Sequence, residues 1–356
     1  MQLGINAKRD NELLITLDWL SFTDLTHSNP KYVCKMLGYS MTDFVEQPKG
    51  SNGYNRMLRN QAGVRILYDG RDGMGVHVDI SGSAIFDVFE HYQKSRFCDC
   101  PFGMAYETDS LDGSVLSDFF RDVCKIGKAT RIDIAIDDKG NQYYSVAEIE
   151  ELIEKNAIVS KFRKYKRELE GSFSSDTTGR TVYFGKRLSD VYIRVYDKQY
   201  EQNEKLESQG TELIQFPWTR WELEFKHDYA VRIAEFFVDD KKIQEIALGV
   251  LSNYVRIIEP DTATRKTRCR VSEKWLSFLD GVKKVRLYIP SGIKAVEETL
   301  AWAKKQWPKA VAKLSLSLED GLSWLFELRD LGLSRLTSSD YQAIQNYRAG
   351  SSVTYA

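Results

Sequence analysis

Short segments in which apolar and ionisable residues alternate are the feature of this chain that most restricts its fold. In residues 131–137, three isoleucines alternate with Asp133, Ala135 and Asp137. Because successive side chains of a β-strand point to opposite faces, such a segment has one apolar and one charged face. The same alternation is seen in three further segments: residues 76–80, 191–197 and 220–225. The pattern therefore predicts a sheet that buries one face and carries ionisable groups on the other.

The order of strand-like and helix-like segments predicts an α+β fold. Strands are expected at residues 15–22, 75–80, 131–137, 158–168, 180–185, 190–197 and 218–227. Helices are expected at residues 30–38, 84–93, 114–126 and 146–155, the last opened by a capping box of Ser145 and Glu148. Beyond residue 229 the apolar period is helical, at residues 229–256, 272–284, 292–314, 318–330 and 338–348. We therefore expect a domain of residues 1–228 with a central antiparallel sheet and flanking helices, followed by an all-helical C-terminal domain of residues 229–356.

Composition restricts the compartment and the partners. The chain of 356 residues has 50 Lys and Arg against 51 Asp and Glu, so a surface for nucleic acid has to be a local patch. Its five cysteines include the pair Cys98-Asp-Cys100, which lacks a second Cys or His pair at zinc-site spacing and so indicates reduced thiols. The sequence has neither a long apolar run nor the apolar segment of a signal peptide. A soluble, cytoplasmic protein without a membrane partner is therefore expected.

The charged strand faces carry five acids that would lie close together if the strands share one sheet. These acids are Asp79, Asp133, Asp137, Glu222 and Glu224. Carboxylates a few ångströms apart repel one another unless a cation balances their charge. A divalent ion with oxygen ligands, Mg²⁺ or Mn²⁺, is one such cation. The alternative is an ordinary charged face, in which Arg131, Arg194 and Arg220 pair with the same acids.

One tyrosine is flanked by cations on a strand-like segment. Tyr196 lies in the run Ile193-Arg-Val-Tyr-Asp-Lys198. A phenol, with a pKa of about 10, is a weak nucleophile at neutral pH. Arg194, Lys198 and a nearby metal would favour the phenolate and stabilise the charge of an attacked phosphate, so Tyr196, Arg194 and Lys198 form the candidate catalytic group. Tyr192 and Tyr200 are the alternative nucleophiles.

Positive charge is concentrated in residues 160–200, which contain ten Lys and Arg against five Asp and Glu. Aromatic residues are interleaved with these cations, as in surfaces that hold a DNA backbone and stack bases. The candidate DNA-binding residues are Lys161, Arg163, Lys164, Lys166, Arg167, Lys186 and Arg187. The alternative is a solvated hairpin. A second basic cluster, residues 265–270, is interpreted as a loop that contacts phosphate.

Four segments of the chain together resemble a known family. The most specific is Tyr183-Phe-Gly-Lys-Arg-Leu-Ser-Asp190, which leads into the run that contains Tyr196. The others are Asp18-Trp-Leu-Ser-Phe22, Arg131-Ile-Asp-Ile-Ala-Ile-Asp-Asp138 and Arg220-Trp-Glu-Leu-Glu224. They are similar to the replication initiation factor (Rep-trans) family, which includes initiators of rolling-circle plasmids, relaxases of integrative conjugative elements and replication proteins of some filamentous phages. The resemblance covers about residues 15–285.

The resemblance implies a nickase-like catalytic domain that cuts and rejoins DNA at an origin of rolling-circle replication. The family's tyrosine would be Tyr196, which would attack a phosphodiester, leave a 5′-phosphotyrosine link and free a 3′-OH that primes synthesis. The family's acidic metal site would fall on Asp133 or Asp137 and on Glu222 or Glu224. The expected partners are double-stranded origin DNA with a single-stranded nick region, a host helicase, and a second copy of the chain in a homodimer.

The chain departs from the family pattern at two points. It has no His-hydrophobic-His pair, which is the metal site of two-histidine nickases, and His77-Val-Asp79 is the nearest match. Lys186 stands where the family usually has Ser. No Walker-type phosphate loop is present, as expected for a transesterification that needs no ATP. Two other functions remain open: a conjugative relaxase with the same chemistry, and a non-catalytic origin-binding regulator with the same fold.

Overall fold

The computed structural model describes residues 7–8, 13–82, 84–97, 113–171, 178–261, 265–281, 283–285, 287, 296–318, 323–336, 340–341, 344–345 and 347–348. The chain divides into two compact units, Met1–Leu287 and Tyr288–Ala356, which we name unit 1 and unit 2. The Cys98-Asp-Cys100 pair lies outside the described residues. In the part of the chain that is described, no helix has the length and apolar character needed to cross a bilayer.

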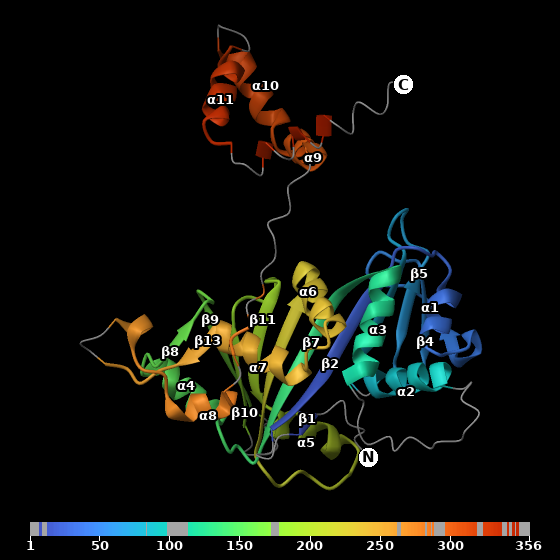
Figure 1. Ribbon diagram of the computed structural model, residues 1–356, viewed down its shortest axis with the longest axis vertical. Coiled ribbons are helices and arrows are strands. Elements are labelled where there is room, and N and C mark those ends of the chain that lie inside the picture. Colours follow the sequence, from blue (N-terminus) through green and yellow to red (C-terminus); the bar gives the residue numbers. More distant parts are fainter. Residues whose placement is uncertain are drawn as a thin grey trace. The chain divides into compact units, whose positions relative to one another are not determined.

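Unit 1 is built on one large sheet (Figure 1). Among the described residues, all neighbouring strands of this sheet are antiparallel. The strand order is β3 (Phe44–Glu46), β4 (Arg56–Asn60), β5 (Arg65–Tyr68), β6 (Val76–Ser81), β2 (Leu13–Asp24), β7 (Gly127–Lys139), β12 (Trp218–Lys226), β11 (Val191–Asp197), β10 (Thr178–Phe184) and β9 (Tyr165–Gly171). The short strand β1 (Ala7–Lys8) pairs with β2. The predicted central antiparallel sheet is therefore confirmed.

The pairing register shows why alternation in the sequence produces one apolar and one charged face. On β7, Ile132, Ile134 and Ile136 are fully buried, and they pair with Phe225, Leu223 and Trp221 of β12, which are also fully buried. The intervening residues pair in the same way, so that Asp133 lies opposite Glu224, and Asp137 lies opposite Arg220. The apolar face is thus continuous across the strands, and so is the charged face.

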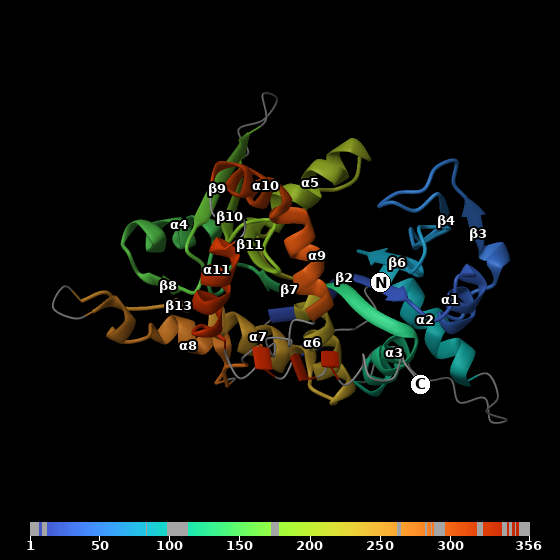
Figure 2. The ribbon, with the colours of Figure 1, turned by 90° about the horizontal axis from the view of Figure 1, so that it is seen from above.

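Helices cover the apolar face of the sheet. The helices α3 (Gly113–Ile126), α6 (His227–Val238) and α7 (Ile243–Tyr254) lie on one side of the central strands, and α5 (Lys198–Ser208) lies toward the other side (Figure 2). The helix α2 (Ala84–Phe97) packs on β2 and β6, and α4 (Val146–Glu154) packs on β10. The short helix α1 (Pro30–Met36) contacts β5. The charged face is covered in part by α5, which contacts β10 and β12.

Local signals explain where several elements begin and end. The capping box expected before α4 is confirmed, since Ser145 Oγ accepts from Glu148 N at 3.2 Å and Glu148 Oε2 accepts from Ser145 N at 2.9 Å. The single strand expected at residues 158–168 is two strands, because the chain turns at residues 161–164. The first part, β8 (Ile158–Ser160), pairs with β13 (Val255–Ile257) in a separate small sheet, and the second part is β9.

The structure divides the chain later than the sequence pattern suggests. The division lies after Leu287 rather than after residue 228. Residues beyond 228 belong to the hydrophobic core of the sheet: Trp275 and Phe278 of α8 (Glu273–Leu279) pack against Trp221 with ring centroids 5.8 Å away in both cases. Unit 2 is helical, with α9 (Val296–Gln306), α10 (Pro308–Ser317) and α11 (Trp324–Leu333). Pro308 at the start of α10 separates two helices where the pattern predicts one, because proline disrupts a helix interior.

This packing predicts where the chain tolerates truncation. A chain that ends at Leu287 is expected to keep the cooperative unfolding of unit 1, because the core around Trp221 stays covered. A chain that ends at residue 228 exposes the apolar face that α6, α7 and α8 cover, and we expect it not to fold. Urea unfolding followed by circular dichroism distinguishes these results. Cooperative unfolding of the shorter chain would contradict the shared core.

Candidate active site

Tyr196 lies on the charged face of the sheet, near the end of β11. Its Cα partners are Arg220 on β12 and Thr181 on β10. The side chain is 5% exposed, and its hydroxyl donates to Glu222 Oε2 over a long 3.4 Å. Two cations flank the ring, with the Arg194 guanidinium 4.5 Å and the Lys198 ammonium 5.6 Å from its centroid. The structure therefore brings together the tyrosine, the arginine and the lysine that were grouped from the sequence.

The surroundings of Tyr196 favour the neutral phenol. Burial raises the pKa of Tyr196 above its ordinary value, and the negative charge of Glu222 raises the same pKa further. The guanidinium groups of Arg220 and Arg194 act in the opposite direction. Burial is the largest of these effects, so the hydroxyl keeps its proton at neutral pH.

Two further ionisable groups at this end of the sheet have displaced pKa values. Burial lowers the pKa of Lys198, and the nearby Arg220 lowers it further, although Lys198 Nζ donates to Glu201 Oε2 at 2.6 Å. Burial raises the pKa of Glu222. The positive charge of Arg194, whose Nη2 donates to Glu222 Oε2 at 2.6 Å, lowers this pKa but does not cancel the effect of burial. The site thus holds a lysine that loses its proton more readily than usual and a glutamate that gains one more readily.

Each of the five acids predicted to bind metal has a positively charged partner. The Asp137 carboxylate accepts hydrogen bonds from Arg220 Nε at 2.6 Å and Nη2 at 2.8 Å, and from Trp218 Nε1 at 2.8 Å. Arg131 Nη2 bridges Asp133, at 2.5 Å, and Glu224, at 2.8 Å. Glu224 also pairs with Lys226. The pairing of Arg131, Arg194 and Arg220 with these acids, stated as the alternative from the sequence, is therefore the arrangement in the structure.

Asp79 belongs to another part of the charged face. It lies on β6, which is separated from β12 by β2 and β7. Its carboxylate accepts from Trp19 Nε1 at 2.9 Å and from Ser21 Oγ and Arg65 Nη2 at 2.5 Å each. The structure thus does not bring Asp79 to Glu222 or to Tyr196.

These carboxylates do not fit a metal ion in this arrangement. Their oxygens are of the type that Mg²⁺ and Mn²⁺ prefer, but arginine or lysine donors already occupy them. Within the described ranges, no three His, Cys, Asp or Glu side chains are grouped so that they could hold an ion. The predicted metal site therefore remains a prediction.

Two acids near Tyr196 were missed by the sequence analysis as site residues. Asp18 Oδ1 receives Arg220 Nη1 at 2.7 Å, and Glu201 pairs with Lys198. Asp18 lies where the register of β2 against β7 shifts between Leu17 and Trp19. Such a bulge interrupts strict alternation, so a period-two pattern does not identify the face of Asp18. Glu201 lies one helical turn after Lys198, a spacing that allows an ion pair and is visible in the sequence.

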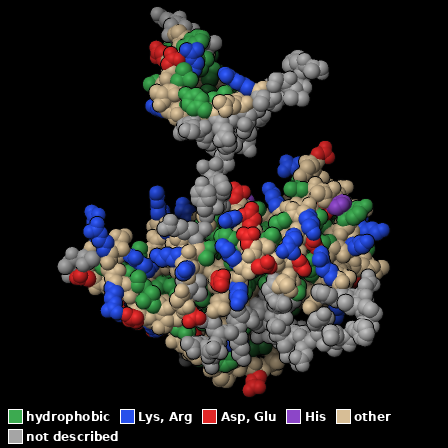
Figure 3. Space-filling view, in the orientation of Figure 1, with side chains coloured by type: hydrophobic (Ala, Val, Ile, Leu, Met, Phe, Trp, Pro, Cys, Tyr) green, Lys and Arg blue, Asp and Glu red, His purple; other side chains and the backbone are tan. Residues whose placement is uncertain are grey.

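The seven candidate DNA-binding cations divide into two groups. Arg167 pairs with Glu154 at 2.6 Å, Lys166 pairs with Glu168, and Lys161 Nζ donates to Asn253 at 2.7 Å. Four others are exposed and have no ion pair with any described residue: Arg163, Lys164, Lys186 and Arg187. Lys and Arg side chains gather at the end of unit 1 where β8 and β9 lie (Figure 3). The unpaired group is the better candidate for phosphate contact, because its charge is not neutralised.

Comparisons with known proteins agree with the fold and the motifs. Residues 127–326 match the replication initiation factor family. A Bacillus subtilis (strain 168) protein named "Putative DNA relaxase NicK" is 29% identical over 289 residues, which are 80% of this chain and 76% of that protein. A solved structure, of the rolling circle replication initiator protein from Geobacillus stearothermophilus, has a similar fold, with a TM-score of 0.61 and 24% identity over 78% of this chain and 98% of that one. Because the matching segment is more than half of the chain, the protein belongs to the replication initiation factor family.

Proposed function

We propose that this protein is a site-specific DNA nicking and closing enzyme that initiates rolling-circle replication, with Tyr196 as its nucleophile. The observation that carries the proposal is the placement of a buried tyrosine between Arg194 and Lys198 on the charged face of the sheet. Membership of the replication initiation factor family supports the reaction class. Tyr196, Arg194 and Lys198 are the proposed catalytic residues.

The proposed reaction is a transesterification. The Tyr196 oxygen forms a bond to the scissile phosphorus, and the bond from phosphorus to the 3′ oxygen breaks. The products are a 5′-phosphotyrosine link and a 3′ oxygen that takes up a proton from water. Attack by that 3′-OH on the link rejoins the strand and releases the tyrosine. The phosphodiester energy is conserved in the link, so neither direction requires ATP.

The chain's own cations suit the charge that develops in this reaction. Arg194 and Lys198 lie 4.5 Å and 5.6 Å from the centroid of the phenol ring, close to the proposed nucleophile. Their positive charge would stabilise the pentavalent phosphorus and the phenolate that forms when the proton leaves. Glu222, which accepts the hydrogen bond of the phenol, is the nearest group that can take this proton. Because Tyr196 is 5% exposed, side chains around its hydroxyl would have to move aside as the phosphate enters.

A divalent ion, Mg²⁺ or Mn²⁺, is part of this proposal as an expectation from the family resemblance. When bound, it would polarise the scissile phosphate. The candidate ligands Asp133, Asp137, Glu222 and Glu224 would first have to exchange their arginine partners.

A conjugative relaxase is the second candidate function. The Bacillus subtilis relative supports it, since that protein is named as a DNA relaxase. Both functions need one nick and the same tyrosine. They differ in the partner that follows, which is a host helicase and polymerase for replication and a transfer apparatus for conjugation. Origin DNA with a single-stranded nick region is the proposed substrate in both cases.

The test of the proposed function is incubation of the purified protein with supercoiled DNA that carries the candidate origin of its own genetic element. With Mg²⁺ or Mn²⁺ present, we expect open circles and a protein–DNA adduct that survives SDS. The same reaction with EDTA measures the dependence on a divalent ion. Tight, specific binding without a nick under any of these conditions would instead support the non-catalytic regulator.

The raised pKa of Tyr196 predicts how the nicking rate changes with pH. Below that pKa the reactive phenolate is a minor species whose fraction rises about tenfold per pH unit. Single-turnover nicking is therefore expected to accelerate steadily from about pH 6 upward, until Lys198, whose pKa burial lowers, loses the positive charge that stabilises the reacting phosphate. The charged groups that face Tyr196 are Glu222 and Arg220 of β12, Arg194 of β11, and Lys198 and Glu201 of α5. A plateau near neutral pH would contradict this prediction and would indicate that another group limits the rate.

A further inference from the structure

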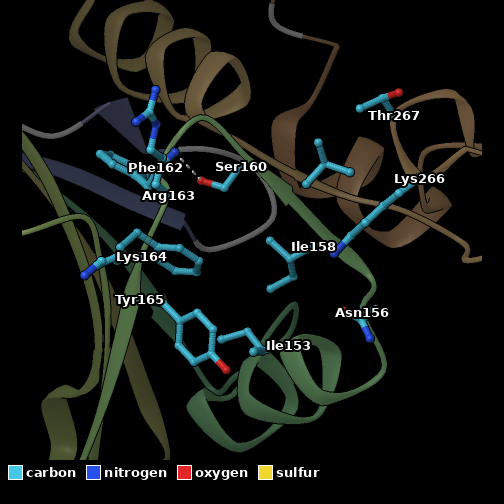
Figure 4. Close-up of a pocket in the computed structure, with 12 residues that line it drawn as sticks. Ile153, Asn156, Ile158, Ser160, Phe162, Arg163, Lys164, Tyr165, Lys266 and Thr267 are labelled. Atoms are coloured by element: carbon cyan, nitrogen blue, oxygen red, sulfur yellow. Dashed lines mark hydrogen bonds between the residues drawn. The ribbon is translucent and has the colours of Figure 1, made fainter.

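A cavity of about 340 Å³ lies in unit 1, and Tyr196 is not among the residues that line it. Figure 4 shows its lining side chains. The cavity is formed by the end of α4, the strand β8, the loop of residues 161–164, and the short helix η2 (Lys266–Arg268). Its apolar and aromatic lining comes from Ile153, Ile158, Val159, Phe162, Tyr165 and Phe184. Three cations also line it: Arg163, Lys164 and Lys266.

The cavity lies on the helix-covered side of the sheet. Phe184, which forms part of its wall, is the Cα partner of Ile193 on β11, and both side chains are buried on the apolar face. Tyr196 is three residues further along β11 and therefore points to the opposite, charged face. A ligand in the cavity is thus distinct from the phosphate that Tyr196 would attack.

The loop that forms one wall is held by backbone hydrogen bonds. Gly185 N donates to Lys164 O at 2.9 Å, and Lys161 N donates to Tyr254 O at 3.0 Å. Phe162 N donates to Ser160 Oγ at 3.1 Å. The ring of Phe162 packs so closely on Gly185 that a Cβ there would lie 2.8 Å from the ring, and Gly185 has a positive φ of 93°. The loop is therefore fixed to the end of β10, to β8 and to Tyr254, and this wall of the cavity is present without a ligand.

The charge around the cavity is positive because the neighbouring acids are already paired. On α4, Glu150 pairs with Arg180, Glu151 with Lys155, and Glu154 with Arg167. Arg163, Lys164 and Lys266 are exposed and form no ion pair with any residue in the described part of the chain. Three uncompensated cations thus surround an apolar space.

We propose that this cavity binds one unstacked nucleotide of a DNA strand, with its base against Tyr165 and its phosphate against Lys164 and Lys266. A volume of about 340 Å³ is at the lower end of the range of about 300–1,000 Å³ for small-molecule sites, which is enough for one planar ring system. Tyr165 is 54% exposed, so its ring is free to stack on a base. The surrounding cations match the charge of the backbone on either side of that base.

The route from this cavity to the active site is also basic. The turn between β10 and β11 carries the exposed Lys186 and Arg187, and its Gly185 is hydrogen-bonded to Lys164 at the cavity. From this turn, β11 runs about 17 Å from Val191 to Tyr196 at the usual rise per residue. A DNA strand that passes around this end of the β-sheet would place the captured nucleotide several nucleotides away from the nick. This inference rests on the proposed function, because it takes the substrate to be DNA.

The experiment measures binding of a single-stranded oligonucleotide from the nick region to the Tyr196→Phe protein, in which no cleavage occurs. One abasic site is moved along the strand. We expect one position at which loss of the base weakens binding about tenfold or more. Adding Tyr165→Ala should weaken binding of the intact strand to the same extent and remove the effect of that abasic site. Tyr32→Ala is the matched control, since Tyr32 is 55% exposed against 54% for Tyr165.

Lys266→Ala provides a second variant with an independent readout. Loss of one phosphate contact should weaken binding and reduce the slope of log affinity against log salt by about 0.7, the value for one charge on a single strand. Lys31→Ala, at another exposed lysine, should leave the slope unchanged. A Lys266→Ala protein with the parent slope would overturn the phosphate contact.

Other outcomes separate this proposal from its rivals. If the effect of every abasic site is the same before and after the Tyr165→Ala substitution, the cavity does not hold a base of the strand. If free dAMP binds in a Tyr165-dependent way while oligonucleotide binding ignores Tyr165, the ligand is a free nucleotide instead. If the wild-type protein nicks DNA but the Tyr165→Ala and Lys266→Ala substitutions do not change DNA binding, only the proposal for the cavity is disproved. If the protein neither binds nor nicks DNA, the proposed function is disproved.

Discussion

Tyr196→Phe is expected to abolish both the nick and the SDS-resistant adduct, with a loss of at least about 10³-fold in the rate of cleavage. The substitution removes one oxygen atom, which is the atom proposed to attack the phosphorus. DNA affinity should remain within about twofold of wild type, because the phenol contributes no charge to the surface that holds phosphate. Gel analysis of supercoiled DNA and a filter-binding titration on the same preparation measure the two quantities.

The fold should tolerate this substitution. The hydroxyl of Tyr196 makes a single long hydrogen bond of 3.4 Å to Glu222, and Glu222 keeps Arg194 at 2.6 Å when the hydroxyl is removed. The expected change in the free energy of unfolding is therefore below about 1 kcal/mol. A loss of cleavage at unchanged stability and affinity would assign the effect to chemistry.

Two neighbouring tyrosines provide the controls. Tyr192 lies on the same face, four residues before Tyr196 and opposite Glu224, and Tyr200 lies on α5. Tyr192→Phe and Tyr200→Phe should both nick at close to the wild-type rate. If the adduct still forms in Tyr196→Phe and is lost in one of these two variants, the reaction class is unchanged but the other tyrosine is the nucleophile. If EDTA leaves the wild-type adduct intact, the expected divalent ion is not required.

The sequence predicted the charged face well, because period-two alternation depends only on local geometry. The register confirms that Asp133, Glu224, Arg220 and Tyr196 share one face. The sequence did not determine which cation each acid meets. Arg131 reaches both Asp133, two residues away, and Glu224, which is 93 residues away. Such partners depend on strand order, and strand order is not encoded in the alternation of any single strand.

Departures from regular geometry account for most of what the sequence analysis missed. The register shift next to Leu17 concealed Asp18, a partner of Arg220. The expected helix of residues 229–256 is two helices, α6 and α7, because the chain turns at Asp240, which has a positive φ of 57°. The strands β3, β4 and β5 were not predicted, since segments of three to five residues carry too little periodic signal.

The cavity beside Tyr165 could not have been predicted from the sequence. It combines Ile153 at the end of α4, Phe184 at the end of β10 and Lys266 beyond α7, which are brought together by tertiary packing. The basic composition of residues 160–200 did predict the region. It could not separate Arg163 and Lys164, which are unpaired among the described residues, from Lys166 and Arg167, which pair with acids. That separation changes which substitutions are expected to weaken DNA binding.

Arg220→Met is expected to lower the free energy of unfolding by about 3–5 kcal/mol, the cost of leaving a buried charge without its partner. Asp137 is 1% exposed and receives two guanidinium hydrogen bonds from Arg220. Urea unfolding gives this change as a shift of the midpoint at constant slope. Arg56→Met is the control: Arg56 pairs with Glu46 at the surface, where both side chains are about half exposed, and its loss should leave the stability nearly unchanged.

A double variant tests whether the effect at Arg220 comes from charge or from packing. In Arg220→Met/Asp137→Asn, residue 137 is neutral but keeps an oxygen for Trp218 Nε1, so more than half of the lost stability should return. If stability does not return, Arg220 acts through packing or through Asp18, its second carboxylate partner. Arg220 is also the Cα partner of Tyr196. The double variant is therefore a folded protein that has one fewer cation beside the proposed nucleophile. We expect it to nick more slowly than wild type while unfolding at a urea concentration closer to that of wild type than the Arg220→Met protein does. Such a result would mean that the Arg220–Asp137 pair serves to position charge at the active site rather than to stabilise the fold.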